Sequence, residues 1–113
     1  LSVATIESAD VKKAAAAVHK ATDLFSEAGD VRGQATALET AATMLLDGGL
    51  YFEAVKVAKQ RAILFRNAGD ASGEGYAMLK LGDMFMKNDD AEKATKVGEV
   101  AMGLFAGIND MEG

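Results

Sequence analysis

Hydrophobic and small side chains recur at helical spacing along most of the chain. Residues 51–67 place one face of a helix in the interior, formed by Ala54, Val55, Ala58, Ala62 and Phe65. Residues 35–47 are rich in Ala, Leu and Met and contain no internal Gly or Pro, which favours a second helix. No segment shows the sustained apolar and polar alternation of a strand. The pattern therefore predicts an all-α protein.

Turn signals divide this pattern into about five full helices. Gly48-Gly49, Ala68-Gly69 and Asn88-Asp89 each interrupt an apolar stretch. A glycine at the end of a helix adopts the left-handed conformation without strain. Asp70 is placed to cap the following helix by accepting backbone N–H bonds. The expected helices span residues 10–28, 35–47, 51–67, about 75–87 and 90 to about 106.

The chain repeats itself every forty residues without insertion or deletion. Leu24-Phe25 recurs as Leu64-Phe65 and as Leu104-Phe105, and Gly29-Asp30 recurs as Gly69-Asp70. Asn109-Asp110 is a degenerate third copy of the second pair. Such a period indicates a repeat architecture in which each unit buries its face on its neighbour. The repeat units span approximately 1–32, 33–72 and 73–113, within one domain of residues 1–113.

The same register applies to the two ends of the chain. Residues 1–8 correspond to residues 41–48, which predicts the back half of a helix followed by a turn. The pair at 109–110 predicts another turn. We interpret the chain as an excerpt of a longer array; the alternative is a fragment that is stable alone.

Alanines at repeated positions predict close helix packing. They recur at 14, 54 and 94 and at 37 and 77, where a larger side chain would force two helices apart. The predicted fold is a helical-hairpin solenoid. Its inner, concave layer consists of the first helix of each pair, and its outer layer consists of the second helices.

The last unit contains Leu81-Gly82 in its first helix and Ala94 and Ala101 in its second. In these residues it resembles the tetratricopeptide-repeat family, in its forty-residue variety found in cell-polarity adaptor proteins. The matching positions are Met78 where the family prefers Trp, Leu81-Gly82, Phe85 in place of Tyr, and the signature alanines Ala94 and Ala101. Gly69-Asp70-Ala71-Ser72-Gly73-Glu74-Gly75 is close to the sequence that joins its units. The usual proline is absent, since the chain has none. The resemblance implies a helical-repeat fold that binds proteins.

In that family the first helix of each pair lines a concave groove that holds the partner. Carried over to this chain, the groove positions are Thr36, Glu39, Thr40, Thr43, Leu46, Asp47, Tyr76, Leu79, Lys80, Asp83, Met86 and Lys87. The forty-residue relatives usually have Asn where Thr40 and Lys80 stand, so their mode of holding a peptide backbone is not expected here. Tyr76 and Lys80 are the best anchors, because aromatic and long cationic side chains dominate recognition.

Composition excludes several classes of protein. The 113 residues carry 12 basic and 17 acidic side chains, so the net charge is −5, and half of the residues are hydrophobic. An acidic chain disfavours nucleic-acid binding through a broad basic face. The absence of Cys excludes disulfides and cysteine-ligated zinc. No membrane-spanning stretch or signal peptide is recognised, which is consistent with a soluble domain in the cytoplasm or an organelle interior, and the compartment is unknown.

Candidates for chemistry are weak. His19, the only histidine, has Lys59 and Glu99 as repeat partners and is interpreted as a surface residue. Asn88-Asp89-Asp90 lacks the spacing of a calcium loop, and the glycine-rich segment 69–75 lacks the Lys-Ser/Thr of a phosphate loop. The methionines at repeat positions are expected in the core. No catalytic residue, metal or cofactor is therefore expected, and the chain is not expected to be an enzyme.

Charge is divided unevenly between the expected layers. Nine of the twelve basic residues, with seven acids, fall within 10–28, 51–67 and 90–106, the second helix of each pair. The simpler interpretation of these basic residues is a solvated helix face, and the alternative is a lysine-rich ridge that docks on an acidic neighbour.

The sequence predicts a non-catalytic scaffold that binds a protein or peptide in its concave groove. The alternative is an architectural subunit of a large assembly that contacts its neighbours through the outer face and the ends.

Overall fold

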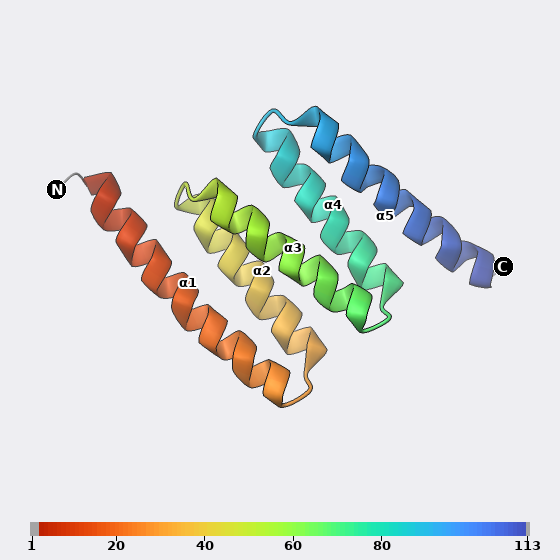
Figure 1. The fold of residues 1–113 in the computed structure, drawn as a ribbon, viewed down its shortest axis with the longest axis horizontal. Helices are drawn as coiled ribbons and strands as arrows, with labels where there is room; N and C mark the ends of the chain where they lie inside the picture. The colour runs from red at the N-terminus through yellow and green to blue at the C-terminus, as the bar shows by residue number, and fades with distance from the viewer. Residues whose placement is uncertain (1–2, 113) are drawn as a thin grey trace. The chain divides into compact units, whose positions relative to one another are not determined.

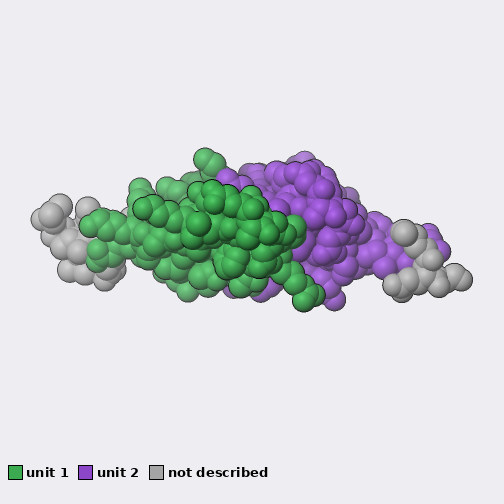
Figure 2. All heavy atoms as spheres, turned by 90° about the horizontal axis from the view of Figure 1, so that it is seen from below, with its two compact units in different colours: residues 1–58 green, residues 59–113 purple. Residues whose placement is uncertain are grey.

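A computed structural model of the chain describes residues 3–112, and these form five α-helices. The helices are α1 (Val3–Glu27), α2 (Val31–Asp47), α3 (Tyr51–Asn67), α4 (Ala71–Lys87) and α5 (Ala91–Glu112) (Figure 1). No strand occurs among the described residues. The all-α prediction and the number of helices are confirmed. The chain divides into two compact units, Leu1–Ala58 and Lys59–Gly113, coloured in Figure 2.

The backbone repeats every twenty residues, half of the period seen in the side chains. Helices α2, α3, α4 and α5 begin at residues 31, 51, 71 and 91, and each of the first three is 17 residues long. A three-residue connection precedes each of them. The middle residue of three connections is a glycine with positive φ: Gly29, Gly49 or Gly69. Asp89, with φ of 58°, takes that place in the fourth connection.

One set of hydrogen bonds closes these turns. After α3, the N–H of Asp70 donates to the carbonyl of Phe65 at 3.0 Å, and the N–H of Gly69 donates to that of Arg66 at 3.1 Å. These bonds satisfy carbonyls that the end of a helix leaves without intrahelical partners. The carboxylate of Asp70 then accepts from the N–H of Gly73 at 2.9 Å, which caps α4. The predicted capping role of Asp70 is confirmed.

Helices α2 and α4 begin four residues earlier than the sequence pattern predicted, at Val31 and Ala71. Glycines in the first turn of each, Gly33 and Gly73, look like helix breakers in the sequence but have a packing role. A Cβ atom on Gly73 would lie 2.5 Å from Cδ1 of Phe65, and one on Gly33 would lie 2.5 Å from Cδ1 of Phe25. The ring that ends one helix thus occupies the space beside the first turn of the next. We call this arrangement the glycine notch.

The predicted turns near the two ends of the chain are wrong. Helix α1 runs unbroken through residues 8 and 9, and α5 continues past Ala106 through Asn109-Asp110 to Glu112. Three of the four internal turns place glycine at the left-handed position and the fourth has Asp89 there, whereas the positions near the ends hold Ser8-Ala9 and Asn109. A missing glycine lowers the preference for a turn. The turn at Asp89 shows that it does not by itself account for the continuing helix. The expectations for residues 1, 2 and 113 lie outside the described residues.

Each unit contains a hairpin of consecutive helices, α1 with α2 and α4 with α5 (Figure 1). In the first unit Leu38, Ala41 and Leu45 of α2 are buried. In the second unit the buried core includes Leu81, Met84 and Phe85 of α4 and Ala101 of α5. A Cβ on Gly82 would lie 3.3 Å from Cγ2 of Val97, so α4 and α5 approach closely there.

The alanines expected at close contacts are buried in part. Ala54 is fully buried, and Ala37 and Ala77 are also buried. Ala14 and Ala94 are only half-buried. The prediction of close packing therefore holds best for the first helices and for α3.

Candidate partner-binding face

The groove positions expected on α4 form one exposed stripe of that helix. Their spacing of three and four residues places them on a single face. All of them are exposed in the structure: Tyr76, Leu79, Lys80, Asp83, Met86 and Lys87. The opposite face of α4 supplies the buried residues Ala77, Leu81 and Met84. Burial of that opposite face therefore fixes which side chains α4 presents to solvent.

Tyr76 is exposed and yet held in place. Its side chain is 60% exposed, but its ring meets the ring of Phe105 edge to face, with centroids 5.2 Å apart and an angle of 68° between the planes. Phe105 comes from α5 and fits against Gly75, where a Cβ would lie 2.7 Å from its Cζ. The missing side chain at Gly75 thus lets the Phe105 ring reach Tyr76.

Helix α5 adds residues that the sequence prediction did not include. Met102 lies one turn before Phe105 on the same side of α5 and is 72% exposed. Leu79 lies one turn after Tyr76 on α4 and is also exposed. We call Tyr76, Leu79, Met102 and Phe105 the α4–α5 face. Gly75 and Tyr76 are adjacent in the sequence, but only the packing of α5 on α4 shows that Phe105 contacts them.

The groove positions expected on α2 lie in the first unit. Thr36, Thr40 and Thr43 are exposed, and Glu39 is half-buried. The hydroxyl of Thr40 donates to the carbonyl of Thr36 at 3.0 Å, so its proton is directed at its own helix. Each predicted set lies on one face of its own helix. A single trough that joins the α2 and α4 sets stays a prediction.

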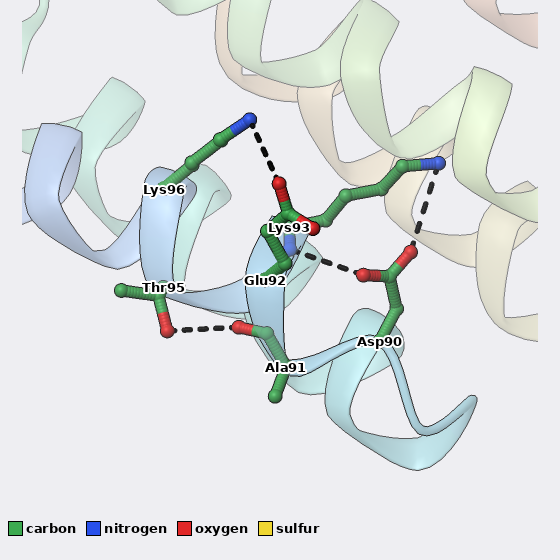
Figure 3. A network of polar contacts seen from close by, with 6 residues as sticks. All are labelled: Asp90, Ala91, Glu92, Lys93, Thr95 and Lys96. Atoms are coloured by element: carbon green, nitrogen blue, oxygen red, sulfur yellow. Dashed lines mark hydrogen bonds and ion pairs between the residues drawn. The ribbon is translucent and has the colours of Figure 1, made fainter.

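The acidic cluster at 88–92 is a helix cap. The carboxylate of Asp90 accepts from the N–H of Lys93 at 3.1 Å and lies 3.7 Å from the ammonium of Lys93 (Figure 3). Glu92 pairs with Lys96 at 3.5 Å. The part of the chain that the structure describes contains no group of three or more His, Cys, Asp or Glu side chains that could hold a metal ion. The contacts of Asp90 and Glu92 are those of a turn that leads into a capped helix, as the sequence indicated for residues 88–92.

His19 and two of the methionines at repeat positions are half-buried in the structure. His19 is half-buried, so its description as an exposed surface histidine is wrong. Helix α1 packs against α2, and this hairpin covers part of the side chains of α1. Of the core methionines, Met84 is buried, whereas Met44 and Met78 are half-buried.

Glu74 is a buried acid that the sequence patterns did not single out. It lies in the first turn of α4 and is 7% exposed. The Nε of Arg66 donates to its carboxylate at 2.9 Å. The N-terminus of a helix favours a carboxylate, and the guanidinium adds an opposite charge. The pair links the end of α3 to the start of α4.

Comparisons with known proteins give no further guide to this site. No protein-family model, curated protein or solved structure matches the chain. Within residues 3–112, none of the helices has the length and apolar character needed to cross a membrane.

Proposed function

We propose that this protein is a non-catalytic helical-repeat scaffold of the tetratricopeptide kind, which binds a segment of another protein on the α4–α5 face. The observation that carries the proposal is Tyr76, an aromatic ring that is largely exposed but fixed by Phe105. A ring that is already ordered loses little conformational freedom when a partner covers it. Exposed aromatic rings of this kind supply much of the binding energy at protein interfaces.

The surroundings of Tyr76 define the kind of segment that fits. Leu79 and Met102 extend the apolar surface beside it, and Lys80 and Lys87 lie further along the exposed stripe of α4. An apolar side chain of the partner would cover Tyr76, and an acidic one would lie near Lys80. Thr36, Glu39 and Thr43 on α2 are a second proposed contact set, which belongs to the first unit.

The experiment selects peptides from a displayed random library on the wild-type chain and measures their affinity for variants. Tyr76→Ala with Lys80→Glu should weaken binding about thirtyfold or more, because loss of a central anchor costs about 2 kcal/mol. The matched control replaces one exposed lysine and one exposed apolar residue elsewhere, Lys20→Glu with Val100→Ala. We expect the control to bind within about twofold of wild type, since isolated exposed positions contribute little.

Thermal melts should show both variants folded. Equal affinity of the selected peptides for wild type and the Tyr76 variant would refute the proposal. So would loss of binding in the control alone.

A second candidate function, an architectural subunit of a large assembly, is favoured by one observation. Phe52 on α3, the second helix of its pair, is 81% exposed, more than any other large hydrophobic residue described. A photo-reactive amino acid at position 52 should cross-link to fixed neighbours in cells if this function holds. Cross-links from position 76 alone would favour binding of a partner on the α4–α5 face.

A further inference from the structure

Helix α3 differs in charge from the rest of the chain. It carries four cations, Lys56, Lys59, Arg61 and Arg66, and one carboxylate, Glu53. The whole chain has a net charge of −5. A basic helix in an acidic chain creates a local positive potential that attracts negatively charged groups.

Two of these cations lie between exposed apolar side chains on one face of α3. Phe52, Lys56, Lys59 and Ile63 are spaced by four, three and four residues, which places them on a single stripe. Phe52 is 81% exposed and Ile63 is 47% exposed, and both lysines are exposed. We call these four residues the α3 stripe.

The other cations of α3 have different roles. Arg61 is half-buried, with its guanidinium carbon 5.2 Å from the centroid of the Phe65 ring. Arg66 binds the carboxylate of Glu74. Glu53 follows Phe52 and lies about 100° round the helix from it. The stripe therefore carries the positive charge of Lys56 and Lys59, with the carboxylate of Glu53 one turn before Lys56.

The forty-residue repeat does not preserve the α3 stripe. The corresponding positions are Glu92, Lys96, Glu99 and Gly103 on α5, and Lys12, Ala16, His19 and Asp23 on α1. Residues that the architecture needs do repeat, such as the Phe and Gly of the glycine notch. Packing of the repeat therefore does not explain why Phe52, Lys56, Lys59 and Ile63 occur together on α3.

We propose that the α3 stripe binds an acidic segment of another protein that carries an apolar residue at each end. Carboxylates would pair with Lys56 and Lys59, and the apolar residues would cover Phe52 and Ile63. These last two are eleven residues apart on a helix, or about 16 Å at 1.5 Å per residue. An extended segment covers that distance in about five residues. The α3 stripe shares no residue with the α4–α5 face, and the proposal does not depend on that face.

The charge of the remaining chain favours a narrow protein segment over a broad anionic surface. Electrostatic interactions are screened beyond about 8 Å at physiological salt, so a single extended segment senses mainly α3. The chain as a whole has a net charge of −5 although α3 carries four cations and one carboxylate, so its remainder is strongly acidic, which disfavours a bilayer or a nucleic-acid duplex as the partner. Complementary charge with two apolar contacts therefore fits an acidic peptide best.

The test uses the full chain and a fluorescein-labelled peptide of four Glu and Asp residues flanked by two Leu residues, which places the Leu residues five positions apart. Binding is measured by fluorescence anisotropy at about 50 and 300 mM salt. We expect Lys56→Glu with Lys59→Glu to weaken binding about tenfold or more at low salt, since reversed charges oppose the ligand. Phe52→Ala should weaken it in both salt conditions.

The matched control is Lys96→Glu, the same substitution at the repeat partner of Lys56 on α5. It should bind within about twofold of wild type. Tyr76→Ala with Lys80→Glu should also leave this peptide's affinity unchanged, so failure of the α3 stripe and failure of the α4–α5 face can be told apart.

Three outcomes would overturn the proposal. The first is no binding of the acidic peptide at about 1 mM, and the second is equal loss with the Lys96 control. The third is binding of phosphatidylserine vesicles or of a labelled oligonucleotide when the acidic peptide does not bind. A peptide with Gln and Asn in place of the acids should bind at least tenfold more weakly than the acidic one.

Discussion

Phenylalanine and glycine form the smallest repeated device in this protein. Phe25 with Gly33 and Phe65 with Gly73 show the same geometry forty residues apart, with a virtual Cβ 2.5 Å from the ring in both cases. The glycine sits in the first turn of a helix, where its own propensity is unfavourable. Two neighbours occupy the space that a side chain would take: the ring, and the capping carboxylate, whose Oδ2 would lie 2.7 Å from a Cβ on Gly33 and 2.8 Å from one on Gly73.

We expect Gly73→Ala to destabilise the protein by about 1–3 kcal/mol, because the methyl group would overpack the Phe65 ring. In a Phe65→Leu background the same substitution should cost at least about 1 kcal/mol less, since the flat ring is gone. Chemical denaturation of the four chains in this cycle gives both values. An equal effect of Gly73→Ala in the two backgrounds would show that the Phe65 ring is not the group that excludes a side chain at position 73.

Ala54 tests the close packing of α3. It is fully buried, so Ala54→Leu should destabilise the fold by about 1–3 kcal/mol through overpacking. Ala106 on α5 is exposed, and Ala106→Leu should change stability by no more than about 0.5 kcal/mol. Thermal melts of the two variants give the comparison. Similar shifts in Tm would mean that the buried face of α3 has been assigned wrongly.

At the scale of elements, the aspartates before α2, α4 and α5 act as caps. Asp30, Asp70 and Asp90 each accept a backbone N–H bond from the residue three positions ahead. We expect Asp30→Ala to cost about 1 kcal/mol of stability. Asp47, the last residue of the same helix, lies near the negative end of the helix dipole. Asp47→Ala should therefore leave stability unchanged or raise it by a few tenths of a kcal/mol.

Urea denaturation gives the free energy of unfolding of the two variants. The comparison is matched, because the same substitution is made at the start of α2 in one variant and at its end in the other. A larger loss for Asp47→Ala than for Asp30→Ala would contradict the capping role.

The internal turns could be located from the sequence, whereas the first residues of α2 and α4 and the extent of α1 and α5 could not. Glycine at 29, 49 and 69 has a local conformational reason, so the turns could be located from sequence alone. Gly33 and Gly73 look like linker residues, and only their contact with a phenylalanine shows that the helix includes them. At Asn109 the forty-residue register predicted a turn, but α5 continues through this residue, and the turn at Asp89 shows that a missing glycine alone does not decide the outcome.

The candidate face was predictable in part for a similar reason. The exposed stripe of α4 follows from helical spacing, so Tyr76 and Lys80 could be named in advance. Phe105 and Met102 belong to a helix that the groove pattern assigns to the outer layer. Their place beside Tyr76 depends on how α5 packs on α4, which no local pattern encodes.

At the scale of the whole molecule, two periods coexist. The backbone repeats every twenty residues, whereas the side chains repeat every forty, so the smallest complete unit is a pair of helices. Deleting residues 31–70 joins Asp30 to Ala71 and keeps a glycine eight positions after Phe25. Deleting residues 31–50 keeps the turn spacing but places Glu53 at the notch.

We expect the forty-residue deletion to remain helical and to unfold cooperatively at a lower Tm than wild type, since repeat proteins lose stability with each unit. The twenty-residue deletion should lose the cooperative transition. Circular dichroism melts distinguish the two variants. Equal cooperativity in both would mean that a single helix, and not the pair, is the unit of the fold.

The glycine notch also has a consequence for folding kinetics. Each notch joins residues only eight positions apart, so its formation closes a short loop, an event of about 10–100 ns. Little chain entropy is lost before the first contacts between consecutive helices are made. Proteins dominated by such local contacts fold in microseconds to milliseconds. We therefore expect folding to begin at either notch, without any need for the two ends of the chain to meet first.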